Sequence, residues 1–290
     1  MKKIFDITVP KDKSEASSNE DAFDYDYQKQ VFALSDGASE SYNSKIWSKI
    51  LVREFVDIPN LSEEWILKCA KKYLKSLDLT NLTESQFIAF NKGSFATLIT
   101  VQRQGNKISI FNVGDSHIFA FAKSQDNDTN STISSKPARY IELFKKPTFT
   151  DNPTLISTKI LNNSFIDFDN IEDSVYFKTL DLKYPFSSLT ELHRKVSFVL
   201  NSSEPINSLR LPDKTAIFLI CATDAVAEWI FKYIEANKTD KIFNFLLSLK
   251  EDKNKGKFEK TVSLCRKLKS MNIDDSTLAI LECEYNHGLS

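Results

Sequence analysis

Glycine is scarce in this sequence, with six residues among 290. Because glycine is the residue that adopts unusual backbone angles and permits close backbone approach, each of the six marks a specific backbone requirement. A basic excess is missing as well, since 38 Lys and Arg stand against 39 Asp and Glu, for a net charge of −1. Nucleic-acid-binding proteins usually carry a basic excess, so we expect no nucleic-acid partner.

Long apolar runs are also absent from the sequence. No run approaches the roughly 18 residues that a membrane-spanning helix needs, so we expect no membrane partner. The first residues, MKKIFDITVPKDKSE, lack the apolar centre of a signal peptide. The expected location is therefore cytoplasmic.

Paired metal-binding cysteines are not found either. The four cysteines (Cys69, Cys221, Cys265 and Cys283) form no C-x-x-C pair, and none lies near a histidine at zinc-ligand spacing. We expect them to be buried, reduced thiols.

The sequence does contain alternating strand-like and helix-like segments. We expect strands at 31–34, 96–102, 107–113, 117–122, 216–222 and 277–283, and helices at 44–56, 63–77, 225–234, 241–249 and 257–271. Gln104-Gly105-Asn106 predicts a hairpin turn, and the strand at 117–122 is expected to pair next. Proline-broken residues at about 123–212 predict an irregular insertion in a single domain spanning 1–290. The order of elements predicts an α+β fold with helices packed on antiparallel sheets.

Acidic residues recur where the apolar strands begin or end. Any one of them could be an N-cap or a turn residue. Strand ends of a packed sheet converge, however, and carboxylates brought together repel one another unless a cation holds them. Without Cys or His, such a group suits Mg²⁺ or Mn²⁺ rather than zinc. The acids are Glu20, Asp21, Asp36, Asp115, Asp224, Asp274 and Asp275.

Six short motifs contain or flank these acids. They are N-E-D-A (19–22), S-D-G (35–37), G-S-F-A-T (93–97), N-V-G-D-S (112–116), A-T-D-A (222–225) and D-D-S-T-L-A-I-L (274–281). In order and approximate spacing the set resembles the metal-dependent protein phosphatases of the 2C type, in a form similar to divergent bacterial members. The resemblance implies an α-β-β-α sandwich of two antiparallel β-sheets flanked by helices.

The resemblance also implies a site for two Mn²⁺ or Mg²⁺ ions. By motif, Asp36 would bridge both ions, Gly37 would offer its carbonyl to one of them, and Glu20 would bind that same ion. Asp224 and Asp274 would hold the other ion, with Asp275 at the position where the family has asparagine. A water activated by the ions would attack phosphoserine or phosphothreonine on a protein substrate, so Asp36, Asp224 and Asp274 would act through the metals.

The phosphate-binding part of the family pattern is altered here. The arginine that many members carry four residues before the metal-binding glutamate is replaced by Ala16. Lys11 or Lys13 could substitute, although a lysine is a point charge and not a two-pronged donor. The histidine often found after the first D-G is replaced by Ala38.

Two further positions concern a third ion and the strand at 117–122. Glu228 stands where some members carry a ligand for a third metal, with Asp151 as a second acid, and a solvated helix-face acid is the alternative for Glu228. We expect His117 to be a core or hairpin histidine and Asp115 to fix the turn before it.

Two other functions remain open. The loss of the phosphate-gripping arginine is compatible with a pseudophosphatase that serves as a binding or regulatory module. A phosphatase acting on a small phosphorylated metabolite is the other alternative. The sequence carries no signal for oligomeric state.

Overall fold

The structure is a computed structural model that describes residues 1–12, 14–124, 138–143, 153–163, 175–181, 215–250 and 254–284. Most of the insertion expected at about 123–212 lies outside the described residues. Lys13 and Asp151 lie outside them as well.

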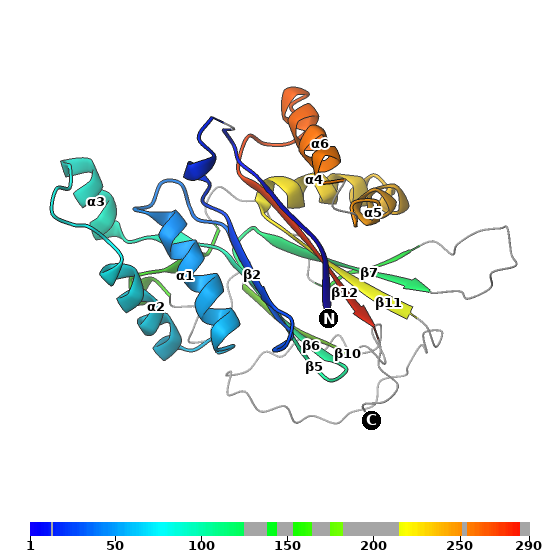
Figure 1. The fold of residues 1–290 in the computed structure, drawn as a ribbon, viewed down its shortest axis with the longest axis horizontal. Helices are drawn as coiled ribbons and strands as arrows, with labels where there is room; N and C mark the ends of the chain where they lie inside the picture. The colour runs from blue at the N-terminus through cyan, green and yellow to red at the C-terminus, as the bar shows by residue number, and fades with distance from the viewer. Residues whose placement is uncertain are drawn as a thin grey trace, which may run out of the picture.

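Two five-stranded antiparallel sheets form the centre of the fold (Figure 1). Sheet A has the order β1 (Lys2–Val9), β12 (Ser276–Glu284), β11 (Thr215–Ala222), β7 (His117–Ser124) and β8 (Arg139–Ile141). Sheet B has the order β10 (Val175–Asp181), β6 (Lys107–Val113), β5 (Leu98–Gln104), β3 (Val31–Ser35) and β2 (Ala22–Asp26). The short strands β4 (Phe95–Ala96) and β9 (Ile156–Ser157) form a separate pair.

Helices cover the outer faces of both sheets (Figure 1). On sheet B lie α1 (Ser44–Asp57) and α2 (Glu63–Lys75), and on sheet A lie α4 (Asp224–Glu235), α5 (Thr239–Leu247) and α6 (Lys255–Lys267). The Ser62 hydroxyl accepts the Trp65 N–H and thereby caps the first turn of α2. The remaining helical segments are α3 (Glu84–Lys92) and the single turns η1 (Ala16–Ser18) and η2 (Ile160–Asn162). Among the described residues, no helix combines the length and apolar character needed to span a bilayer.

Apolar side chains pack in three layers that alternate with the sheets. Between the sheets, Leu34 and Ile99 of sheet B lie in one cluster with Leu219 and Leu281 of sheet A. A second cluster joins sheet B to α1 and α2, and a third joins sheet A to α4, α5 and α6. The helix–sheet–sheet–helix arrangement expected for the chain is therefore confirmed.

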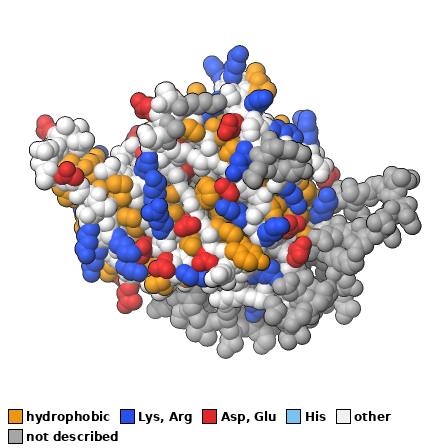
Figure 2. Space-filling model, in the orientation of Figure 1, with side chains coloured by type: hydrophobic (Ala, Val, Ile, Leu, Met, Phe, Trp, Pro, Cys, Tyr) orange, Lys and Arg blue, Asp and Glu red, His pale blue; other side chains and the backbone are white. Residues whose placement is uncertain are grey.

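Basic and acidic side chains are interspersed over the face of the molecule shown in Figure 2. This mixture matches the near balance of 38 basic and 39 acidic residues. Three of the cysteines are buried as expected, whereas Cys265 on α6 is partly exposed.

One expected strand pairing is wrong. The hairpin at 104–106 is confirmed by pairing of Gln104 with Lys107, but β7 pairs with β11 and β8 in sheet A and not with β6. The segment after β6 carries the chain from sheet B to sheet A. Gly114 makes this crossing possible, because its φ is +96° and an added Cβ would lie 2.6 Å from Cγ2 of Thr97.

The layer between the sheets gives a stability prediction. Leu219→Ala should lower the free energy of unfolding by about 2–5 kcal/mol, because it opens a cavity in a fully buried position. Leu264→Ala, in α6 at 56% exposure, should change it by no more than about 0.5 kcal/mol. Urea denaturation of both variants would measure this, and equal losses would contradict the assignment of the core.

Candidate metal centre

The acidic residues lie along one edge of both sheets. Asp36 follows β3, Asp115 lies between β6 and β7, and Asp224 begins α4 directly after β11. The strand register aligns these ends, because Ala22 pairs with Ser35 in sheet B, and Ala222 pairs with His117 and Leu278 in sheet A. Antiparallel pairing therefore gathers acids that are far apart in the sequence.

The backbone of Asp36 is held by Thr97, which interrupts the strand expected at 96–102. The Asp36 N–H donates to Thr97 Oγ1 at 2.9 Å, and the Thr97 N–H donates to the Asp36 carbonyl at 2.8 Å. Thr97 Oγ1 also lies 2.8 Å from Ser116 Oγ. Thr97 belongs to the G-S-F-A-T motif and Ser116 to the N-V-G-D-S motif. These two motifs therefore hold Asp36, the acid of the S-D-G motif, in position.

Gly37 is required by the close approach of α1. A Cβ at this position would lie 2.8 Å from the carbonyl carbon of Ser44, the first residue of that helix. Only glycine leaves room for the backbone there, and its carbonyl belongs to the predicted ligand set.

Five carboxyl groups, Asp21, Asp36, Asp115, Asp224 and Asp274, form the acidic cluster. Burial raises the pKa of Asp36 well above its ordinary value, and the charges of the other four raise it further. Burial, and then Asp115 and Asp274, raise the pKa of Asp224 to about 8. Burial is also the main cause of the raised pKa of Asp115 and Asp274. The carboxyl charges that act on Asp36 and Asp224 would stabilise a cation bound among them.

Asp21 is the innermost member of the acidic cluster. Its Oδ2 accepts hydrogen bonds from Thr277 Oγ1 at 2.7 Å and from Thr223 Oγ1 at 3.2 Å. Its Oδ1 is buried and has no amide, hydroxyl or ammonium donor among the described residues. Burial raises the pKa of Asp21 to about 7. A buried oxygen without a donor is a position that a cation or its water shell would satisfy.

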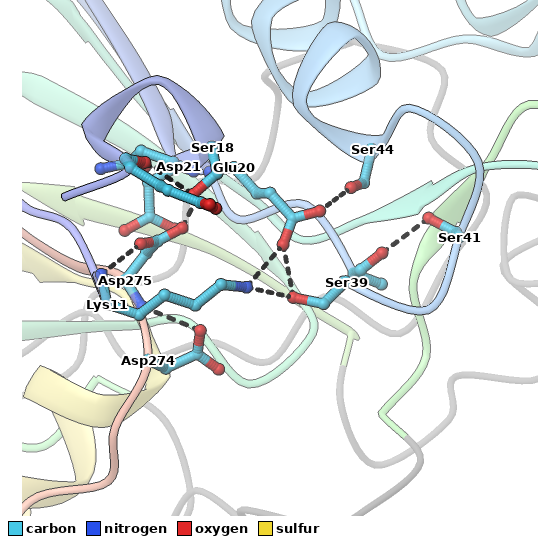
Figure 3. A network of polar contacts seen from close by, with 12 residues as sticks. Lys11, Ser18, Glu20, Asp21, Ser39, Ser41, Ser44, Asp274 and Asp275 are labelled. Carbon is cyan, nitrogen blue, oxygen red and sulfur yellow. Dashed lines mark hydrogen bonds and ion pairs between the residues drawn. The ribbon is translucent and has the colours of Figure 1, made fainter. Parts of the chain in front are cut away.

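Asp275 has a different role from Asp274. Its Oδ1 accepts the Lys11 N–H at 2.7 Å, and its Oδ2 accepts the Glu20 N–H at 2.8 Å (Figure 3). Asp275 is 2% exposed, so both oxygens serve the backbone. These contacts support the choice of Asp274 as the ligand of the pair.

Glu20 is turned toward side-chain donors (Figure 3). Oε1 accepts a hydrogen bond from Ser44, and Oε2 accepts one from Ser39 and one from Lys11 Nζ, at 3.1 Å for the lysine. In the described part of the chain, no three His, Cys, Asp or Glu side chains are already arranged to hold a metal ion. The oxygen donors thus fit Mg²⁺ or Mn²⁺ in their chemistry, while Glu20 would have to exchange its present partners for a cation.

The structure adds to the sequence-based roles of two residues. Glu228 binds Lys232 Nζ at 3.1 Å and Asn272 Nδ2 at 3.1 Å, which favours the helix-face alternative over a third-metal ligand. Asp115, expected only to fix a turn, belongs to the acidic cluster through its effect on Asp224.

His117 is the core histidine that was expected. It is 2% exposed, its ring lies 4.8 Å from that of Phe119, and burial lowers its pKa to about 3. The imidazole is therefore neutral near pH 7.

Sequence reasoning missed the roles of Asp21 and of the serines around Glu20. The position of Asp21, directly before β2 and beside Glu20, was the available signal for a buried acid at a strand end. Ser39 and Ser44 carried no such signal, because both are common turn and helix-start residues.

Comparison with known proteins gives only distant similarity. No protein-family model matches the chain, and a search of curated proteins finds no similar sequence. Among solved structures, a bacterial serine phosphatase is 15% identical, with 97% of this chain and 98% of that chain covered and a TM-score of 0.46. Stp1 from Staphylococcus aureus is 17% identical (95% and 93% covered, TM-score 0.43), and PstP/Ppp from Mycobacterium tuberculosis is 10% identical (95% and 97% covered, TM-score 0.45). At these identities and TM-scores the similarity assigns no family.

The raised pKa values predict how stability depends on pH in the presence of EDTA. Asp21 and Asp224 hold protons in the folded chain that the unfolded chain releases near the ordinary value of 3.8. Their contribution to stability is complete below that value and is lost as the pH rises through about 7 and about 8. The free energy of unfolding, measured by urea denaturation, should therefore fall between about pH 5 and about pH 8.

Asp224→Asn should make this fall shallower, because the amide does not ionise. Asp57→Asn is the control, since that side chain is 65% exposed on the end of α1. An equal slope in wild type and Asp224→Asn would contradict the shifted pKa of Asp224.

Proposed function

We propose that the protein is a Mn²⁺- or Mg²⁺-dependent phosphatase that hydrolyses phosphoserine or phosphothreonine in protein substrates. The observation that carries this proposal is the acidic cluster at one edge of the sandwich, in which burial and the charges of neighbouring carboxyls raise the pKa of Asp36 and Asp224. A group of oxygen donors without Cys or His is typical of hard divalent cations. Oδ1 of Asp21, which no N–H or hydroxyl group of the described residues reaches, is also compatible with a cation or ordered water at this place.

The proposed ligands follow the position of each acid. Asp36 would contact both ions, the Gly37 carbonyl and Glu20 would hold one of them, and Asp224 and Asp274 the other. When bound, the ions would supply an activated water and neutralise charge on the phosphoryl group.

The chain itself supplies orientation and proton handling. Thr97 holds the backbone N–H and carbonyl of Asp36, so the point from which the carboxylate extends is fixed before any ion binds. Asp21 Oδ1 can accept a hydrogen bond from a water in the cluster, while Thr223 and Thr277 hold the other oxygen in place. Of the two lysines considered for phosphate binding, Lys11 is the one described, and its ammonium lies at Glu20.

A binding or regulatory module without useful turnover is the second candidate. It is favoured by Ala16 at the position of the family's phosphate-gripping arginine, together with the attachment of Lys11 to an acid of the site. An assay of turnover separates the two candidates.

Asp36→Asn tests the enzymatic proposal. With added Mn²⁺, the variant should hydrolyse p-nitrophenyl phosphate and a phosphothreonine peptide at least roughly 100-fold more slowly than wild type, because the shared ligand is lost. Asp57→Asn should retain wild-type activity. Absence of any metal-dependent difference would refute the enzymatic proposal, and a strong preference for phosphorylated metabolites over peptides would change the substrate class.

Asp224→Ala tests the ligand assignment directly. Mn²⁺ binding followed by calorimetry should weaken by about 10- to 100-fold, because one carboxylate of the set is removed. Glu228→Gln is a matched control four residues along the same helix, and it should bind Mn²⁺ as wild type does. Similar losses in both variants would instead include Glu228 in the site.

A further inference from the structure

Glu20 differs from the acidic cluster because a cationic side chain of the protein already lies on it. Lys11 Nζ is 3.1 Å from Glu20 Oε2 and 3.0 Å from Ser39 Oγ (Figure 3). Ser39 in turn donates to the same glutamate oxygen. Lysine, serine and carboxylate thus form a closed triangle at the rim of the site.

The position of Lys11 is set by the backbone and not only by its flexible side chain. Asp275 accepts the N–H groups of Lys11 and Glu20 with its two carboxylate oxygens, which holds the two segments side by side. Arg266 on α6 donates to the Pro10 carbonyl at 2.8 Å and also to the Asp274 carbonyl. The segment before Lys11 and the segment bearing Asp274 are therefore fastened to the same helix.

The charge of this lysine opposes the binding of a second cation at the same oxygen. The side chains of Lys11 and Glu20 are 32% and 17% exposed, so water screens the pair only in part. A divalent ion on Glu20 would have to displace the ammonium from Oε2 or accept it as a close neighbour of like charge. The serines at Glu20 are neutral donors and impose no such repulsion.

We propose that Lys11 is a built-in counter-ion that competes with the divalent cation for Glu20 and thereby sets the affinity of that half of the metal centre. This inference rests on the proposed function, because it takes Glu20 as a cation ligand. It assigns Lys11 a role at the metal centre before any substrate phosphate arrives. Lys11 is thus a positioning residue that acts through Glu20.

The test is Mn²⁺ calorimetry on the full chain after treatment with EDTA. Lys11→Met should bind Mn²⁺ about 10-fold more tightly than wild type, because the competing charge is removed. Lys11→Arg keeps the charge and should stay within about 3-fold of wild type. Lys250→Met is the matched control, since Lys250 and Glu282 form a remote pair at 3.5 Å with similar exposures of 37% and 17%.

A double-mutant cycle shows whether the effect passes through Glu20. In a Glu20→Gln background, Lys11→Met should change Mn²⁺ affinity much less, because the carboxylate that the ammonium contacts is gone and only its weaker effect on Asp274 is left. Thermal unfolding of each variant verifies that it is folded, and loss of the fold in Lys11→Met would itself contradict a role in competition. Unchanged or weaker Mn²⁺ binding by folded Lys11→Met would overturn the inference.

The two proposals fail in different ways. If Mn²⁺ binding depends on Asp224 but not on Lys11, the counter-ion inference is wrong and the metal centre stands. If neither wild type nor Lys11→Met binds Mn²⁺, both proposals are wrong.

Discussion

Repulsion among buried carboxyls is the constraint on which the site depends. Burial and neighbouring carboxyl charges raise the pKa of Asp36 and Asp224, so bringing these groups together opposes folding at neutral pH unless protons or cations compensate. The stability that offsets this repulsion comes from elsewhere, namely the three apolar layers between and outside the two sheets. The sandwich therefore serves as a rigid frame whose edge holds groups that would separate in a less firmly packed chain.

Much of the fold follows from local patterns in the sequence. Buried strands such as β6 and β11 are short, apolar and rich in β-branched residues, and α1 and α2 have a clear apolar side. Two elements were missed for different reasons. The first strand, KKIFDITV, does show the alternation of a half-buried strand, because Phe5, Ile7 and Val9 are buried while Asp6 and Thr8 lie between them. By contrast, α3 buries none of its side chains and so lacks an apolar face. The pairing of β7 could not be predicted locally, because a chain that crosses between sheets has the same strand pattern as a hairpin.

The residues of the site could likewise be predicted from the sequence only in part. Acids at strand ends are visible in the sequence, and motif order suggested which of them belong together. The contacts that fix these acids are not visible in the sequence. Asp275, for example, binds the backbone of Lys11 and Glu20, which precede it by 264 and 255 positions. Asp115 illustrates the limit: its local setting predicts a turn residue, and only the crossing from sheet B to sheet A places its charge beside Asp224.

The loop after Gly37 contributes to the contact between Lys11 and Glu20. Ser41 accepts the Phe95 N–H and donates to the Ala38 carbonyl, which fixes the loop against β4, while Ser39 bonds both Glu20 and Lys11. The loop thus directs the hydroxyl of Ser39 to Glu20, the acid proposed as a metal ligand. The ammonium of Lys11 carries one positive charge, so in the proposed site Glu20 and a phosphate oxygen would share it. Cation affinity and phosphate handling would then depend on the same side chain.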